Sequence, residues 1–280
     1  AGTAVAATVL STLGGKSYGA GVVTVSNAIV ISGTTAQLTA ALVTSASKVI
    51  AATALITGTG TDMTVAELNA LDDTTSGIIT ATLVTAATAD YSSLTDDNGN
   101  NVLTITINDA ASTSITAAAL STIGGKTAGV VTVTNAIVVT GTTAQLTAAL
   151  VTANTLVVAG TATGTISDAD DVSIAATALS AIGGKTSGAI TVTNAIVVTG
   201  TTAALTAALV TADTLVVVSD AKATISDAAS TSIAATALSA IGDKTTGVVT
   251  VTNAIALSGT NTQLTAALVT ADTLVVAGTA

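Results

Sequence analysis

The sequence predicts a β-rich solenoid, either a β-helix or a leucine-rich-repeat-like α/β coil, elongated, with about 30 residues per coil and short helical segments. The composition, a long internal repeat and the alternation of apolar and polar residues all favour it. Of the 280 residues 49% are hydrophobic, yet the only aromatic residues are Tyr18 and Tyr91. Large globular cores usually depend on aromatic side chains. A core built only of Ala, Val, Leu and Ile suits thin stacked coils.

The repeat is marked by a short segment that reads Ile-Gly-Gly-Lys-Thr at Ile123 and at Ile182, and Ile-Gly-Asp-Lys-Thr at Ile241. The two steps between these three segments are equal in length. Related segments begin at Leu13 and, in degenerate form, at Leu71. We therefore expect one solenoid over residues 1–280. Its repeats are expected at 1–59, 60–108 (degenerate), 109–167, 168–226 and 227–280.

Each repeat divides into two halves of roughly 30 residues, and each half is expected to hold two strands flanking one helix. In the third and fourth repeats the expected strands are 136–141, 155–159, 164–167 and 189–193, and the expected helices are 142–151 and 172–182. Thr142 and Asp168 lie where helix N-caps belong, and Gly183-Gly184 follows a helix as a C-cap would. The strand 189–193 alternates apolar and polar residues, which favours one buried face.

Four asparagines follow corresponding strands, one in each non-degenerate repeat: Asn27, Asn135, Asn194 and Asn253. A side-chain amide in the turn of a coil can bond to backbone groups of its own coil and of the next. We expect these residues to form a structural ladder. A ligand-binding role is the alternative.

Segments 165–179 and 189–194 read Thr-Ile-Ser-Asp-Ala-Asp-Asp-Val-Ser-Ile-Ala-Ala-Thr-Ala-Leu and Ala-Ile-Thr-Val-Thr-Asn. They resemble the Ala/Thr/Val-rich repeat regions of large bacterial, cyanobacterial-type, extracellular surface and adhesin proteins. The resemblance covers most of the chain. It implies an adhesin-like, sheath-like or S-layer-like setting outside the cell, and it implies no catalytic residue.

The charge and the missing residue types exclude several functions. A net charge of −10 argues against nucleic-acid binding, which needs basic patches. Polar residues interrupt every apolar run, so no membrane span is expected despite a mean hydropathy of +0.80. The chain has no His and no Cys, which removes the usual catalytic triads, and we expect no enzyme. The Gly-Gly-Lys-Thr segments lack the first glycine of a phosphate-binding loop, since Leu10, Leu120 and Leu179 stand there.

Two further patterns suggest binding. Asp96, Asn98 and Asn100 flank a Gly turn, and closely spaced oxygen ligands of this kind suit Ca²⁺; an ordinary surface loop is the alternative. No other cofactor is expected. Thr-x-Thr pairs in the strands suggest ice binding as a minor alternative. Val157 and Ala159 replace them in the other half-repeat, which would break the Thr lattice.

The phase of the repeat suggests self-association. Ala1 is equivalent to Asp170 and Ala280 to Ala162, so the sequence begins and ends nearly in phase, without a polar capping repeat. The expected function is that of a structural, secreted protein at the cell surface or beyond it. It would be a subunit of a self-assembling filament or sheath, a head-to-tail homopolymer of stacked solenoids. The alternative is a stalk segment of a giant adhesin or S-layer-like protein, with a cell surface or polysaccharide as its contact.

Overall fold

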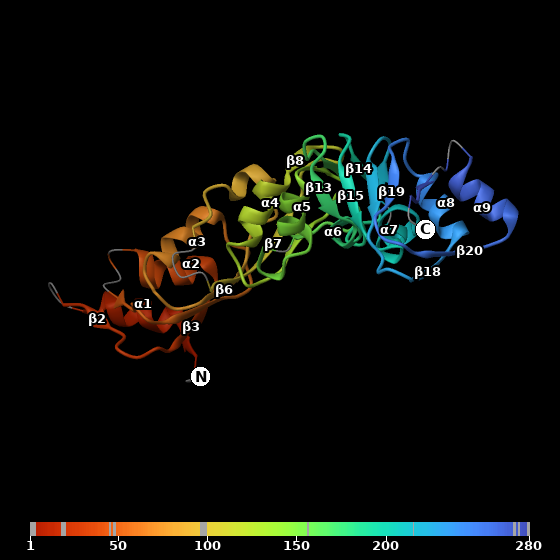
Figure 1. Ribbon diagram of the computed structural model, residues 1–280. Coiled ribbons are helices and arrows are strands. Elements are labelled where there is room, and N and C mark those ends of the chain that lie inside the picture. Colours follow the sequence, from red (N-terminus) through yellow and green to blue (C-terminus); the bar gives the residue numbers. More distant parts are fainter. Residues whose placement is uncertain are drawn as a thin grey trace. The chain divides into compact units, whose positions relative to one another are not determined.

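The structure, a computed structural model, describes residues 4–17, 21–44, 46, 49–95, 100–155, 157–214, 216–270, 273 and 275–278. Its strands form parallel sheets, with helices packed beside them (Figure 1). The chain divides into two compact units. Unit 1 comprises residues 1–109, 119–134 and 153–158, and unit 2 comprises residues 110–118, 135–152 and 159–280. Every sheet belongs to one unit, so each unit has its own framework.

Unit 1 is built on a seven-stranded parallel sheet and a two-stranded one. The larger sheet consists, in spatial order, of β1 (Val5–Ala6), β3 (Val30–Gly33), β5 (Leu55–Gly58), β6 (Ile79–Thr82), β7 (Val102–Ile107), β9 (Val131–Val133) and β11 (Val157–Val158). The smaller consists of β2 (Val23–Thr24) and β4 (Val49–Ile50).

Unit 2 contains two five-stranded parallel sheets and a two-stranded one. The first consists of β8 (Ser114–Thr116), β10 (Val138–Gly141), β12 (Thr163–Ile166), β14 (Ile190–Val192) and β16 (Val216–Val218). The second consists of β13 (Ser173–Ala175), β15 (Val197–Gly200), β17 (Lys222–Ile225), β19 (Val249–Val251) and β21 (Val275–Val276). The third consists of β18 (Ser232–Ala234) and β20 (Ala256–Ser258).

Nine α-helices occur among the described residues. They are α1 (Ala7–Gly15), α2 (Thr35–Leu38), α3 (Val65–Asp72), α4 (Ala117–Gly124), α5 (Thr143–Leu150), α6 (Ala176–Gly183), α7 (Thr202–Leu209), α8 (Ala235–Gly242) and α9 (Asn261–Leu268). A π-helical segment (Thr39–Val43) extends α2, and short 3-10 helices cover Thr88–Tyr91, Ala153–Thr155 and Ala212–Thr214. Capping explains where several begin: the Thr142 hydroxyl accepts from the Gln145 amide, and the Gln145 side chain accepts from the Thr142 amide.

The chain winds through unit 2 with a period of three elements. When only strands and α-helices are counted, strands that pair with each other from β12 onwards are three elements apart along the chain, as are the helices of the pairs α6-α7 and α8-α9. This rule generates the sheets β12-β14-β16 and β13-β15-β17-β19-β21 and the strand pair β18-β20. Successive strands of a sheet are therefore one winding apart, as in Val138↔Thr163.

One sequence repeat contains seven of these elements, from β13 to β17, before the next copy begins at β18. Seven elements make two windings of three elements and one element more. Each copy therefore starts one element later in the winding than the copy before it. The equivalent strands β8, β13 and β18 accordingly lie in three different sheets, and none pairs with another. The predicted elongated β-rich solenoid of tandem repeats, with two coils in each copy, is therefore wrong. The chain is an α/β fold of several parallel sheets, with nine helices among its described residues, and its sequence copies do not stack as equivalent layers.

The expected helix 172–182 is also too long. Its first part is the strand β13, and α6 begins only at Ala176. Ile174 stands at helical spacing from Ala178, but it faces inward from a strand. Asp168 does not cap α6. Its carboxylate accepts from the backbone amide and hydroxyl of Thr143, at 2.6 and 2.7 Å, at the first turn of α5. The prediction of an N-cap at Thr142 is confirmed.

Ladders of aliphatic side chains form the buried faces of the sheets. In the first sheet of unit 2, Ile115, Val139, Gly164, Ile190 and Val216 are register partners in turn, and all are buried. A Cβ on Gly164 would lie 2.4 Å from Cδ1 of Ile190. The equivalent pair in the second sheet is Ala223 and Val249. The smaller residue on one strand thus matches the larger one on the next, as close packing requires.

The first glycine of the Gly-Gly-Lys-Thr segment allows the backbone of another segment to pass close to it. A Cβ on Gly183 would lie 2.4 Å from the carbonyl oxygen of Thr214, whereas a Cβ on Gly184 would have no neighbour nearer than 3.3 Å. Gly184 has φ −70°, so no left-handed cap conformation is involved. In the last copy Asp243 occupies the position of Gly184, because this second position has room for a side chain. The expected glycine C-cap is therefore a packing requirement at Gly183.

Candidate association surfaces

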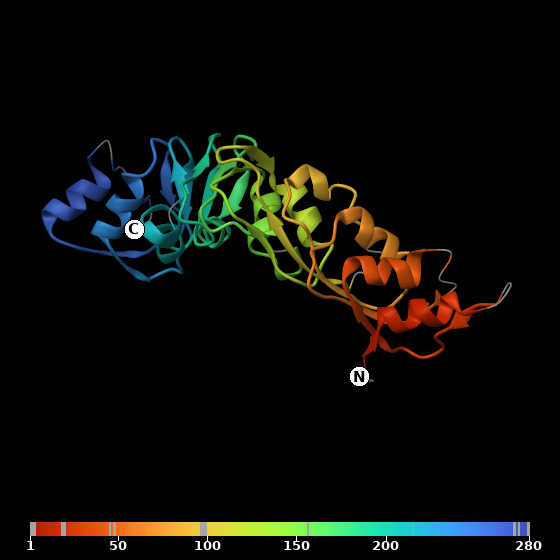
Figure 2. The ribbon, with the colours of Figure 1, turned by 180° about the vertical axis from the view of Figure 1, so that it is seen from behind.

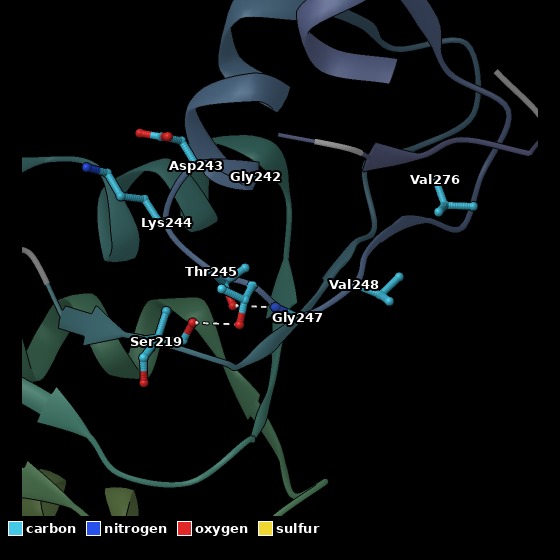
Figure 3. A pocket seen from close by; sticks show the side chains of 10 residues that line it. Ser219, Gly242, Asp243, Lys244, Thr245, Gly247, Val248 and Val276 are labelled. Atoms are coloured by element: carbon cyan, nitrogen blue, oxygen red, sulfur yellow. Dashed lines mark hydrogen bonds between the residues drawn. The ribbon is translucent and has the colours of Figure 1, made fainter. Parts of the chain in front are cut away.

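A pocket with a volume of about 580 Å³ follows α8. Its wall includes Ser219, Asp243, Lys244, Thr245 and Gly247, and Figure 3 shows the side chains of Asp243 and Lys244 extending away from Thr245 and Gly247. The Thr245 hydroxyl accepts from the Gly247 amide at 3.1 Å. The loop is thus held by its own hydrogen bonds.

The threonine of this pocket belongs to a motif that sequence reasoning missed. A Thr-x-Gly pair occurs at Thr75, Thr127, Thr186 and Thr245, and each hydroxyl donates to a backbone carbonyl of the preceding winding. It also accepts from the glycine amide two positions later, as at Gly129 and Gly188. The motif therefore joins successive windings. Its recurrence in the sequence was the available signal.

The predicted calcium ligands are mostly outside the described residues. Asp96 and Asn98 lie there, and Asn100 is described and exposed. Across the described ranges, no three acidic, His or Cys side chains converge on a potential metal position. Calcium at this loop stays a prediction. The neighbouring Asn101 is fully buried: its amide donates to Asp72 at 2.9 Å and its oxygen accepts from the Ile79 amide at 2.8 Å.

The four predicted ladder asparagines lie in the turns after strands. The amide of Asn194 donates to the carbonyl of Asp168, and that of Asn253 to the carbonyl of Asp227, each one winding earlier. Asn135 is half-buried in the same turn, and Asn27 is exposed. Bonds of this kind are what a structural role requires; the ladder itself stays a prediction.

The threonine pairs proposed for ice binding do not form one row. The first threonine of each pair lies on β9, β14 or β19, which belong to three different sheets, and the second follows the end of that strand. One hydroxyl of each pair is also turned to the backbone: Thr134, Thr193 and Thr252 donate to the carbonyls of Ile107, Ile166 and Ile225, each at 3.1 Å. No flat array of free hydroxyls results from these strands.

Tyr91 compensates for the degenerate second copy. Where other copies have a full α-helix such as α5 or α7, this one has the 3-10 helix Thr88–Tyr91. The ring of Tyr91 is buried there, and its hydroxyl lies 2.8 Å from the carbonyl oxygen of Val84 and 2.9 Å from that of Thr106. Burial raises the pKa of the Tyr91 hydroxyl above its ordinary value. Tyr91 thus has a structural role: its buried ring lies where other copies have a full helix.

At the C-terminal end of unit 2, apolar side chains are exposed at positions that are buried elsewhere. Leu257, Leu264 and Leu268 are half-buried. Their equivalents in the preceding copy are Val198 and Leu205, both 0% exposed, and Leu209, 1% exposed. The flanking strands β20 and β21 are edge strands of their sheets. We call β20, α9 and β21 the C-terminal surface.

Unit 1 has a corresponding surface made of β1, α1 and β2. Leu13 is 51% exposed, whereas its equivalents Ile182 and Ile241 are 0% exposed. Val9 is exposed as well, and Val5 is half-buried. Both β1 and β2 are edge strands. We call β1, α1 and β2 the N-terminal surface.

None of the helices in the described part of the chain has the length and apolar character needed to cross a bilayer. No protein-family model matches the chain, and neither the curated proteins nor the solved structures yield a significant match.

Proposed function

We propose that this chain is a structural protein that associates with copies of itself outside the cell, as a subunit of a filament or sheath. The observation that carries the proposal is the partial exposure of Leu257, Leu264 and Leu268 at positions whose equivalents are buried. Apolar surface of this kind, bordered by open strand edges, favours association.

The composition supports the same proposal. With no Cys, the protein does not depend on the redox state of its surroundings. The net charge of −10 keeps an aliphatic protein soluble before it assembles. The resemblance to bacterial surface repeats points to the same setting. A contact between two different surfaces does not close on itself in general, and it therefore produces a polymer.

Sedimentation velocity over a concentration series tests the proposal, with electron microscopy of the same samples. We expect species larger than the monomer whose fraction rises with concentration. A protein that stays monomeric throughout contradicts the proposed function.

A matched pair of variants tests whether the apolar surface is responsible. Leu264→Lys with Leu268→Lys places two charges on the C-terminal surface and should abolish association. Thr262→Lys with Thr265→Lys adds the same charge to exposed positions of the same helix and should leave association nearly unchanged. Equal effects of the two variants would show that charge alone, and not this surface, controls association.

A further inference from the structure

We infer that the two surfaces bind each other. The N-terminal surface of one copy adds to the C-terminal surface of the next, so that β1 pairs with β20, α1 packs on α9, and β2 pairs with β21, both strand pairs parallel. This inference rests on the proposed function and names its contact.

The first support is that both surfaces present the same three elements in the same chain order. The N-terminal surface reads strand, helix, strand as β1, α1 and β2, and the C-terminal surface reads β20, α9 and β21. A partner surface must offer two parallel strand edges with a helix between them, and each surface offers that to the other.

The second support is that each of the two motifs already packs on a strand-helix-strand motif of the other kind within the chain. In unit 1, β1, α1 and β2 pack on β3, α2 and β4: the strands pair in parallel and the helices touch. Figure 2 shows α1 and α2 side by side at the red end of the chain. In unit 2, β18, α8 and β19 pack in the same way on β20, α9 and β21. These internal pairs occupy one edge of each of β1, β2, β20 and β21, and the proposed contact uses the free edges of the same four strands, in the same register.

The third support is that both surfaces expose apolar side chains whose equivalents in other copies are buried. In the β18–β20 pair, Ile233 faces Leu257. By sequence alignment Val5 is the equivalent of Ile233, so β1 of a second copy places Val5 opposite Leu257. Leu13 and Val9 of α1 then cover α9 with its Leu264 and Leu268. The half-buried residues of both surfaces are buried by the same contact.

The internal registers also predict which residues meet. Ala234 faces Ser258 in the β18–β20 pair, and Ala6 is the equivalent of Ala234. Ala6 of one copy therefore lies opposite Ser258 of the other. In the β19–β21 pair Thr250 faces Val276, and in the β2–β4 pair Thr24 faces Ile50. Thr24 of one copy therefore lies opposite Val276 of the other.

Disulfide trapping tests these pairs, because the native chain has no Cys. Four proteins are made, each with one change at an exposed strand position: Ala6→Cys, Thr24→Cys, Ser258→Cys and Val276→Cys. Facing residues on adjacent strands lie within the Cα separation of about 4.4–6.8 Å that a disulfide spans. Oxidised mixtures of two proteins are then analysed by non-reducing electrophoresis.

We expect a dimer from Ala6→Cys with Ser258→Cys and from Thr24→Cys with Val276→Cys. The crossed mixture of Thr24→Cys with Ser258→Cys is the matched control and should give none. Each protein alone should also give none, because a head-to-tail contact never places a residue opposite itself. Circular dichroism confirms that each variant folds.

The outcomes separate this inference from the proposed function. A native chain that sediments as a monomer contradicts the proposed function. A chain that associates, but cross-links equally in the crossed mixture or with itself at Ser258→Cys, refutes the head-to-tail pairing alone. Association without any of the expected dimers refutes the pairing as well.

Discussion

The match between Gly164 and Ile190 gives the sharpest test of the packing. Gly164→Ala adds a Cβ that would lie 2.4 Å from Cδ1 of Ile190 and 3.4 Å from Cδ2 of Leu146. Overpacking of this size costs about 1–3 kcal/mol, and the stiffer unfolded chain returns about 0.4–1 kcal/mol. We expect the free energy of unfolding to fall by about 1–2 kcal/mol.

Ile190→Val removes the Cδ1 atom with which the new methyl group collides. Alone it leaves a small cavity and should cost about 0.5–1.5 kcal/mol. Together the two substitutions reproduce the Ala223–Val249 pair of the neighbouring sheet. The double variant should therefore be nearly as stable as the native chain, which amounts to a coupling of about 1.5–3.5 kcal/mol, the sum of the two single costs.

Urea unfolding followed by circular dichroism measures all four proteins of this cycle. Gly160→Ala is the control, because nothing lies within 4 Å of a Cβ at that exposed position. Gly160→Ala should raise the free energy of unfolding slightly, because it stiffens the unfolded chain and adds no steric clash in the folded one. If the two substitutions are additive within about 0.5 kcal/mol, the size match is refuted.

Three further predictions concern stability. Gly183→Ala should destabilise strongly, by about 3 kcal/mol or more, because the new Cβ meets a backbone carbonyl that cannot turn away, while Gly184→Ala should be nearly neutral; urea unfolding of the two, side by side, checks this. Asp168→Ala should cost about 1.5–3 kcal/mol through loss of the charge-assisted bonds to α5, and a melting temperature equal to that of the native chain would contradict the capping role. Because the pKa of Tyr91 is raised in the folded protein, its contribution is complete below the unfolded value of about 10 and is lost as pH rises through the folded value. The native chain should thus lose stability above pH about 10 relative to its own value at pH 8, and Tyr91→Phe, less stable at pH 8, should lose less; parallel declines would refute this.

Part of the fold could be predicted from local sequence. Thr142 followed by Gln145 is a capping pattern that acts within a few residues, and α5 begins where the pattern places it. The alternating strand around Ile190 was predicted for the same reason, because burial of one face is a local property.

The winding could not be predicted in this way. Nothing local in Ser173–Ala175 distinguishes a short strand from the first turn of the helix that follows. Asp168 acts on Thr143 in the preceding winding, and Gly183 is fixed by Thr214 in the next. Such contacts depend on how many elements complete one winding, and the period of the sequence repeat hides that number. For the association surfaces, the sequence predicted only that the solenoid would lack capping repeats. It did not show which strands and helices form each surface.

The seven-element repeat in a three-element winding has a consequence for how this chain can change in length. Each added copy contributes seven elements, which is two full windings and one further element. The copy that follows therefore begins on the next of the three faces of the winding. Only the gain or loss of three copies restores the original arrangement. The gain or loss of one or two copies would move the helices of every later copy to a different face of the winding. Copy number is therefore under a geometric constraint that the repeat alone does not reveal.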